Sequence, residues 1–324
     1  MNVEKLYDLY SNNVYSVINS HMLATISDRS YDIHGYNLIN RILIYIQNKY
    51  TTSLRSESGW DIVGRQVKHR ASPIWVIDNV IKTEYIDPDT DEVIENIGLT
   101  PKEIEEAVRF GTINKVKHID GIKCIPVFNV KDTVVKDSDI YKEFVYNERK
   151  QIKLSTILAV VNQEFGIDCV QGDEESSYDS ESNIITIGKD ELEDKVRVVA
   201  TALFYQVGLH ESAVDFMEEY NVEAEVLVRM MHICLSFICE SIVSYCCPGY
   251  EVEADVYKDI EELELNEVET EVFIQMLSTI YDIVEEVICL INPSNHNISE
   301  STLRKAAELL NILEANEAIM KYRR

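Results

Sequence analysis

Glycine and proline are scarce in this sequence of 324 residues, with 11 and 6 copies. Turn-rich all-β folds and glycine-rich architectures use more of both residues, so the composition argues against them. Basic residues are also in the minority, because 30 Lys and Arg stand against 57 Asp and Glu. The formal net charge of −27 excludes attraction of the whole surface to nucleic acid or anionic lipid, since like charges repel over roughly 8–10 Å.

Signals for export are missing as well. The chain does not open with a basic start and an apolar run, so no secretory leader is expected. The seven cysteines include no Cys-x-x-Cys pair, which favours free thiols in a reducing cytoplasm, that of a bacterial host cell. The most apolar stretch, residues 230–250, is interrupted by Glu240 and therefore predicts a buried helix and no membrane partner.

Standard catalytic motifs are absent too. The sequence has no dinucleotide-binding Gly-x-Gly-x-x-Gly, no P-loop and no Gly-x-Ser-x-Gly. It has no His-Glu-x-x-His either, and in the nearest segment, residues 210–214, Val214 stands where the second histidine would be. A helix needs two ligands four residues apart to hold zinc. No metal and no cofactor are therefore expected.

The negative charge is unevenly divided. Lys and Arg minus Asp and Glu gives +2 over residues 1–77, −3 over residues 1–150 and −24 over residues 151–324. A local contact with nucleic acid in the first half is thus compatible with the total net charge of −27. The asymmetry predicts two surfaces with different partners.

Hydrophobic periodicity predicts an α+β fold, with N-terminal helices and a small antiparallel sheet before a mostly helical part with short strands. In the first half the expected helices cover residues 3–25, 36–50, a short segment around Trp60, and a segment that starts at Thr100-Pro101. The expected strands cover residues 73–77, residues 80–86 as its hairpin partner, and residues 122–130.

In the second half the expected elements are helices at 154–165, 191–207, 213–246, 251–290 and 298–322, and a strand at 183–187. We expect three parts: an N-terminal domain of residues 1–145, a second domain of residues 146–249 and an acidic helical C-terminal segment of residues 250–324.

The most informative motifs lie between residues 31 and 77. They are Tyr36-Asn37-Leu38, Leu43-Ile44 with Gln47, Ser58-Gly59-Trp60, Val63-Gly64-Arg65-Gln66-Val67-Lys68 and Pro73-Ile74-Trp75-Val76, followed later by Val127-Phe128-Asn129-Val130. In order and spacing, over about residues 5–135, they resemble the N-terminal domain of ArdC-type antirestriction proteins. That domain also occurs in plasmid primases and in LtrC-like conjugation proteins.

This resemblance implies a module that binds single-stranded DNA, and the local chemistry is compatible with it. Residues 65–70, named the basic turn below, carry cations suited to phosphates. Trp60 and Trp75 offer ring faces on which bases stack, although a place in the core is the competing interpretation for Trp60. The family's Lys-Lys-Gly-Glu-Lys-Gly turn is replaced here by Lys68-His69-Arg70-Ala71-Ser72-Pro73. The candidate nucleic-acid-binding residues are Arg65, Lys68, His69, Arg70, Trp60, Trp75, Asn37 and Gln47.

A zinc-peptidase-like domain follows in ArdC and LtrC-like proteins, and its flanking segments are matched by residues 183–187 and 221–227. At the place of His-Glu-x-x-His stands Ala200-Thr201-Ala202-Leu203-Phe204, and Glu223 persists at the place of the third ligand. Ala and Phe have no lone pair for zinc, and Thr201 cannot serve as a carboxylate base. The resemblance therefore implies a pseudo-metallopeptidase that is no enzyme. Its degenerate zinc-site positions are Ala200, Thr201, Phe204 and Glu223.

The run from Glu261 to Glu271 alternates acids with aliphatic residues. One interpretation is the solvated face of helices. The other is an array of carboxylates that imitates DNA phosphates and is steered into the basic cleft of a host enzyme. The candidate partner-binding residues are Glu261, Glu262, Glu264, Glu267, Glu269 and Glu271.

The favoured function is that of a non-enzymatic antirestriction or anti-defence protein of a mobile element or phage, which binds single-stranded DNA or a host defence protein. The first alternative is an acidic DNA mimic that blocks a host nuclease, of restriction or CRISPR type, through its C-terminal half. The second is a metallopeptidase with unconventional ligands such as His210, Glu211 and Glu223. The expected partners are single-stranded DNA, a host defence nuclease or another basic protein, and the sequence leaves the oligomeric state open.

Overall fold

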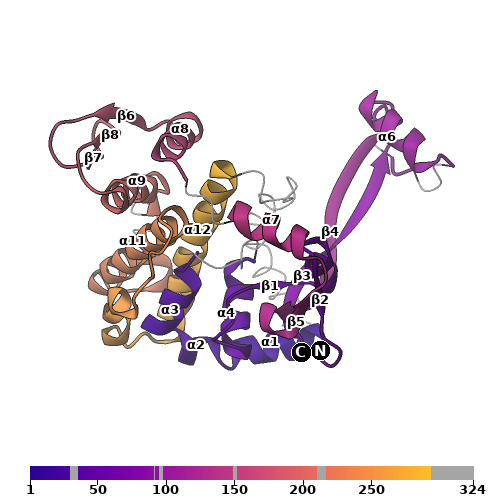
Figure 1. Cartoon of the computed structure of the whole chain (residues 1–324), viewed down its shortest axis with the longest axis horizontal. Helices are drawn as coiled ribbons and strands as arrows, with labels where there is room; N and C mark the ends of the chain where they lie inside the picture. The colour runs from indigo at the N-terminus through magenta and orange to yellow at the C-terminus, as the bar shows by residue number, and fades with distance from the viewer. Residues whose placement is uncertain (30–35, 91, 95–97, 149–151, 210–216, 293–324) are drawn as a thin grey trace. The chain divides into compact units, whose positions relative to one another are not determined.

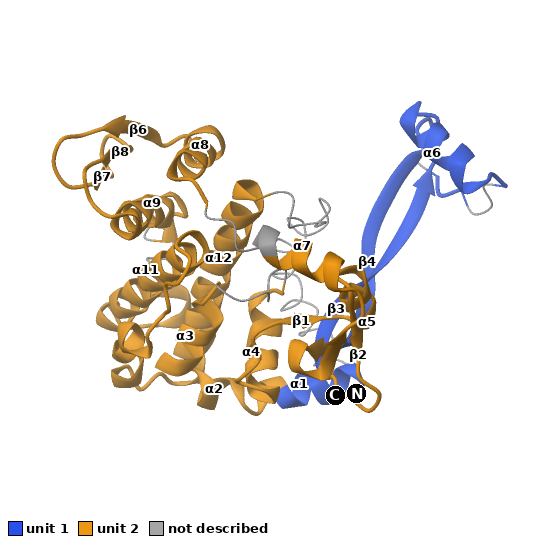
Figure 2. Cartoon of the chain, in the orientation of Figure 1, with its two compact units in different colours: residues 1–9, 75–126 blue, residues 10–74, 127–324 orange. Residues whose placement is uncertain are grey.

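The computed structural model describes residues 1–292 of the chain, except residues 30–35, 91, 95–97, 149–151 and 210–216. Helices and three small sheets make up these residues, which confirms the predicted α+β class (Figure 1). The chain divides into two compact units (Figure 2): unit 1 contains residues 1–9 and 75–126, and unit 2 contains residues 10–74 and 127–324. The boundaries at residues 145 and 249 stay a prediction.

Residues 3–25, expected to form one long helix, form three short ones, α1 (Val3–Ser11), α2 (Val14–Val17) and α3 (Ser20–Ser27). The helix expected over residues 36–50 is present as α4 (Leu38–Gln47). The side chain of Asn19 accepts the N–H of Met22 at 2.9 Å, and that of Asn37 accepts the N–H of Asn40 at 2.9 Å. Asparagine at the N-cap satisfies a helix start in this way, so Asn19 begins a new helix instead of continuing the old one.

Unit 1 is built on a two-stranded hairpin. Its elements are β3 (Ile74–Ile86), α6 (Pro101–Arg109) and β4 (Asn114–Asn129). The expected turn within residues 73–86 is wrong, because β3 runs through it as one strand and lies beside β4. Asp78 and Asn79, which lie between the two expected strands, do not adopt the positive φ that a tight two-residue hairpin turn requires.

The motifs of unit 2 lie on the third strand of the β3–β4 sheet, a two-stranded sheet and three helices. The first group comprises β1 (Leu54–Arg55), α5 (Glu57–Ile62), β2 (Arg65–Val67), the 3-10 helix η1 (Val130–Asp132), β5 (Thr133–Val135) and α7 (Ser138–Glu148). β1 pairs with the end of β4 at Asn129 and Phe128, and β2 pairs with β5. Both pairings are antiparallel, as expected for this half.

The second half contains the helices expected at residues 154–165 and 191–207 and the strand expected at 183–187. Its elements are α8 (Leu154–Phe165), β6 (Asp168–Gln171), β7 (Ser177–Asp179), β8 (Ile184–Ile187), α9 (Leu192–Gln206), α11 (Ala224–Cys246), the 3-10 helix η2 (Ala254–Glu262) and α12 (Glu267–Ile291). β6 and β7 were not predicted, and the helix expected over 251–290 is divided into η2 and α12. β8 is the central strand, parallel to β6 and antiparallel to β7. The helix expected over residues 298–322 lies outside the described residues.

One hydrophobic core joins the helices of both halves within unit 2. α11 packs on α9 and α12, and α3 packs on η2. Buried side chains of α3 and α4, such as Leu23 and Ile42, belong to the same core as Phe237 and Phe273. Because these helices bury their apolar sides against one another, the acidic residues of the second half are left at the surface.

One described helix, α11, is long and apolar enough to cross a membrane by composition alone. Most of its apolar window is buried against the rest of the fold. The helix therefore serves as a core helix here, as the interruption by Glu240 predicts.

Candidate nucleic-acid interface

Arg65 holds the β2–β5 ribbon together. Its Nε donates a hydrogen bond to Thr133 Oγ1 at 2.6 Å. Its guanidinium carbon lies 4.6 Å from the centre of the Tyr141 ring and 5.9 Å from that of Trp60. Arginine is suited to this place because its planar fork stacks on rings while it donates in the plane. Arg65 therefore makes its hydrogen bonds within the fold, and it is a positioning residue for the exposed residues 68–70 that follow.

The three residues after β2 are exposed and cationic or titratable. Lys68, His69 and Arg70 all have exposed side chains, and Arg70 has a φ of 74°. The N–H of Lys68 donates to Asp132 O at 2.8 Å, and its ammonium donates to Lys131 O at 2.6 Å. Lys131 is exposed as well. The ribbon thus anchors the turn next to a further cation from η1, in an arrangement that suits phosphate contacts.

Gly64, which precedes Arg65 in the motif, lies where the backbone requires a glycine. Its φ is +77°, and a Cβ at this position would lie 2.6 Å from Asp137 O. The carbonyl of Gly64 accepts the N–H groups of Lys136 and Asp137 at 2.8 and 2.9 Å. Only glycine combines this conformation with such a close backbone approach.

The ring and amide candidates serve the fold. Trp60 is 1% exposed, and its indole N–H donates to Phe128 O at 2.8 Å, so it lies in the core and offers no free ring face. Trp75 is half-buried on β3. Asn37 caps α4, and the Gln47 amide donates to Leu43 O at 3.1 Å, one turn earlier in the same helix. The exposed candidates in unit 2 are therefore Lys68, His69 and Arg70.

The degenerate zinc-site positions do not form a donor set. Ala200 and Phe204 are buried in the core. Thr201 Oγ1 donates to Arg197 O at 2.9 Å and lies 3.8 Å from the sulfur of Cys239, whose pKa burial raises to about 11. Glu223 is an exposed N-cap of α11. Among the described residues no three His, Cys, Asp or Glu side chains gather for a metal, so these residues do not fit zinc. His210 and Glu211 lie outside the described residues.

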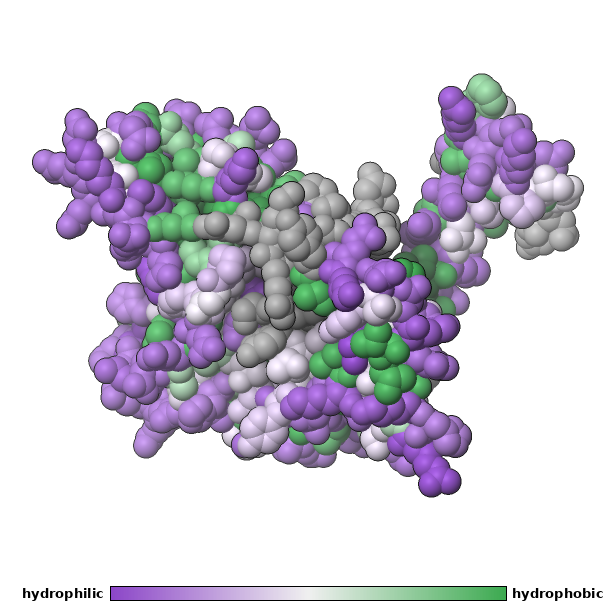
Figure 3. All heavy atoms as spheres, in the orientation of Figure 1, coloured by the Kyte–Doolittle hydropathy of each residue, from purple (hydrophilic) through white to green (hydrophobic). Residues whose placement is uncertain are grey.

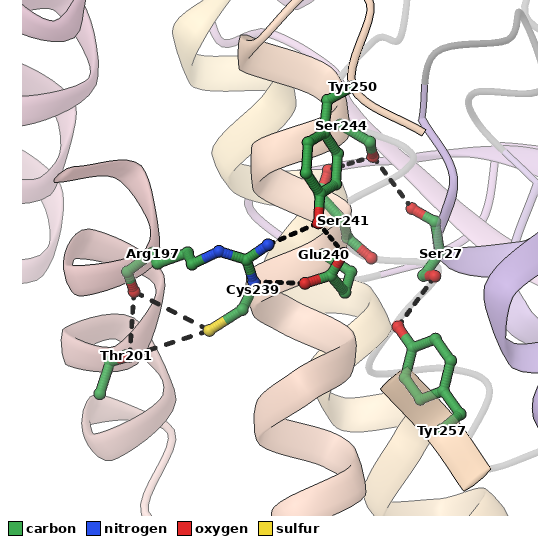
Figure 4. A network of polar contacts seen from close by, with 9 residues as sticks. All are labelled: Ser27, Arg197, Thr201, Cys239, Glu240, Ser241, Ser244, Tyr250 and Tyr257. Carbon is green, nitrogen blue, oxygen red and sulfur yellow. Dashed lines mark hydrogen bonds and ion pairs between the residues drawn. The ribbon is translucent and has the colours of Figure 1, made fainter. Parts of the chain in front are cut away.

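A buried ionic network lies beside these positions (Figure 4). Glu240 of α11 is 1% exposed and pairs with Arg197 of α9. Tyr250 donates to the other carboxylate oxygen at 2.6 Å and accepts from Arg197 at 2.5 Å. Burial and then Glu240 raise the pKa of Tyr250 to about 12. We did not predict this network, although a carboxylate inside an apolar helix is a signal that a cation must lie opposite.

A second polar cluster ties α3 to the same helices (Figure 4). Tyr257 donates to Ser27 Oγ at 2.9 Å, and Ser244 donates to the Ser27 carbonyl at 3.3 Å. All three residues are buried. These contacts fix α3 on α11 and η2, because buried polar groups without partners are costly.

The acidic candidates are largely engaged within the chain. Glu261 accepts from Ser20, Glu262 pairs with Arg229 at 3.1 Å, Glu269 completes the capping box of α12, and Glu271 accepts from Tyr15. The remaining two, Glu264 and Glu267, are exposed. The run from 261 to 271 is therefore divided between η2 and the start of α12.

No protein-family model and no curated protein matches the chain. Two solved structures that resemble it are the metal-free and Mn(II)-bound crystal structures of antirestriction ArdC protein from R388 plasmid. They are 14% and 11% identical, with TM-scores of 0.38 and 0.41.

Both neighbours carry the name of the family that the motifs resemble. The metal-free structure covers 78% of this chain and 85% of its own, and the Mn(II)-bound structure covers 91% and 98%. At such TM-scores the likeness assigns no role to any residue of this chain.

Proposed function

We propose that this chain is an antirestriction protein that binds single-stranded DNA through its basic turn and performs no hydrolysis. The observation that carries the proposal is the anchoring of exposed Lys68 and Arg70 by the β2–β5 ribbon, next to exposed Lys131. Support comes also from the sequence resemblance to ArdC-type proteins. Cations held at a fixed turn bind the phosphate backbone without reading the sequence.

Residues in the second half of the chain support the proposal that the protein performs no hydrolysis. The two positions at which the resemblance expects histidine ligands are occupied by Ala200 and Phe204, both buried. The neighbouring charge of Glu240 is neutralised by Arg197 and bound by Tyr250. A buried carboxylate held in this way is neither a general base nor a ligand for an incoming metal.

The test compares the affinity for a fluorescent single-stranded oligonucleotide between the wild type and Lys68→Ala/Arg70→Ala. Loss of two phosphate contacts makes the slope of log K against log salt less negative by about 1.4. The control is Lys189→Ala/Lys258→Ala, which removes two exposed cations from the acidic half.

A second readout is the protection of unmodified phage DNA in a restricting host. We expect protection by the wild type and by the control variant, and loss of protection by the basic-turn variant. If the wild type has no affinity for single-stranded DNA at 50 mM salt, where the Debye length is about 14 Å, the proposed DNA contact is wrong. If the wild type gives no protection, the proposed antirestriction role is wrong.

A further inference from the structure

Helix α6 of unit 1 is stabilised by its own ends. Thr100 and Glu103 form a reciprocal capping box at its start. At its end, the N–H of Thr112 donates to Ala107 O and that of Gly111 to Val108 O, with Gly111 at a φ of 72°. This is the Schellman pattern, so both ends of the helix are satisfied locally.

No residue of α6 is buried. Across the described part of residues 75–126, the buried side chains are those of Val76 and Ile113. A helix of nine residues is marginal in water without tertiary packing, and the two caps supply what packing does not. The helix is thus stabilised by its caps although none of its residues is buried in a core. This indicates that α6 serves a contact with another molecule.

The ends of this helix expose apolar side chains. Phe110, the C-cap residue, is 75% exposed, and Leu99, just before the N-cap, is 41% exposed. Aromatic residues of this exposure are typical anchors of protein interfaces. In Figure 3 the surface around α6 is mostly hydrophilic, with hydrophobic residues among the polar ones. We call residues 99–113 the hairpin tip.

The charge around the tip is strongly negative. Residues 87–109 contain eight Asp and Glu against two Lys and Arg. The carboxylates nearer the middle of the strands are paired, since Glu84 pairs with Lys82 at 3.0 Å and Asp78 with Lys123 at 3.5 Å. Glu105 and Glu106 are exposed and have no ion pair within the described residues.

We propose that the hairpin tip is a docking element for a basic protein, with Phe110 as the apolar anchor and Glu105 and Glu106 as its charged rim. Charge complementarity selects this occupant. Phosphates of nucleic acid and anionic lipid headgroups are repelled by the same carboxylates, and so is a second copy of a chain of net charge −27. A basic surface with an apolar pocket is the partner that gains from both features.

The inference goes beyond the proposed DNA contact and takes its partner class from the proposed function. The basic protein is a host restriction enzyme, whose DNA-binding surface is cationic. The chain then has two contact surfaces of opposite charge, the basic turn for DNA and the hairpin tip for the enzyme.

The test uses the full chain and a restriction endonuclease purified from a host in which the wild type protects unmodified phage DNA. The tip variant is Glu105→Lys/Glu106→Lys/Phe110→Ser. The matched control is Glu218→Lys/Glu219→Lys/Ile62→Ser, which changes the charge equally and removes an exposed side chain of the same 75% exposure. Binding to the endonuclease is measured by biolayer interferometry at 50 and 300 mM salt. These concentrations lie below and above the roughly 100 mM at which the Debye length is about 10 Å.

We expect the tip variant to bind the endonuclease at least about tenfold more weakly, the control to change by less than about twofold, and the wild-type affinity to fall with salt. The partial variants Phe110→Ser and Glu105→Gln/Glu106→Gln each weaken binding. All variants keep the melting temperature of the wild type, because no residue of α6 is buried and the substituted side chains of the control are exposed.

Endonuclease binding that survives the tip substitutions overturns the inference and leaves the proposed function standing. A tip variant that instead loses affinity for single-stranded DNA, or that changes the sedimenting mass of the chain, assigns the tip to nucleic acid or to self-association and also overturns it. A wild type that gives no protection in any host overturns both proposals.

Discussion

Arg197 of α9 and Glu240 of α11 form an ion pair inside the second half of the chain, and Tyr250 binds both partners. Arg197 lies about one helical turn before Ala200 and Thr201, two of the positions that the family resemblance equates with the zinc site. The carboxylate is almost fully buried, which makes its partner essential.

We therefore expect Arg197→Ala to lower the free energy of unfolding by about 3–5 kcal/mol, because it leaves the Glu240 carboxylate buried and unpaired. The double variant Arg197→Met/Glu240→Leu should recover most of the loss, since replacing both partners leaves no buried charge. Urea denaturation of the single and double variants measures both values. A double variant no more stable than the Arg197 variant would show that the pair is not the cause.

Trp60 should behave as a core residue in solution. In the variant Trp75→Phe the fluorescence of the remaining tryptophan should resist quenching by acrylamide and should stay constant when single-stranded DNA is added. Trp60→Phe should cost about 1–3 kcal/mol of stability, because the part-buried Phe128 carbonyl loses its donor. Quenching of Trp60 by DNA would contradict the buried position.

Substitution of Arg65 should mainly lower stability, whereas substitution of the exposed cations Lys68 and Arg70 should mainly lower DNA affinity. Arg65→Ala should destabilise the fold by about 1–3 kcal/mol through lost hydrogen bonds and ring contacts. It should change DNA affinity less than Lys68→Ala/Arg70→Ala does, when both are measured well below the melting temperature. Arg65→Lys should not restore stability, because an ammonium cannot stack and donate in one plane. The opposite ranking of affinities would place Arg65 on the DNA.

Gly64→Ala should be more costly than an ordinary glycine replacement. The added methyl group would meet Asp137 O at 2.6 Å in a backbone of positive φ, for which we expect about 2–4 kcal/mol. Gly166→Ala is the matched control, since Gly166 has a φ of +66° with nothing within 4 Å of the added carbon. Thermal denaturation compares the two variants, and equal losses would rule out the steric contact as the cause.

Asp282 predicts a dependence of stability on pH. Burial and the nearby Glu285 raise the pKa of Asp282 to about 7, well above its value of about 4 in the unfolded chain. Because the folded state then binds the extra proton between about pH 4 and 7, its stability falls as the pH rises through this window.

Asp282→Asn removes this titration. We expect the variant to be more stable than the wild type at pH 8, by about 2–4 kcal/mol, and the difference to shrink towards pH 4. Urea denaturation between pH 4 and 8 measures the trend. A difference that does not vary with pH would contradict the raised pKa.

Much of the local structure could be read from the sequence because its causes are local. Thr100-Pro101 with Glu103 starts α6, Asn37 starts α4, and Gly166 ends α8 through its positive φ. Each signal acts within one turn of the helix that it begins or ends. The hairpin predicted within residues 73–86 is wrong for a non-local reason, since β3 stays extended where the distant strand β4 pairs with it.

The sequence by itself determined locally capped helices such as α6 and α8, the uneven charge, the apolar residues Ala200 and Phe204 in α9, and the cations of the basic turn. Only the tertiary structure decided what each charged or aromatic side chain contacts. It placed Arg65 on Thr133, Trp60 on Phe128 and Arg197 on Glu240, pairs separated by 68, 68 and 43 residues. Such partners meet because burial of apolar surface brings distant segments together, and a polar side chain carried inside must then be paired.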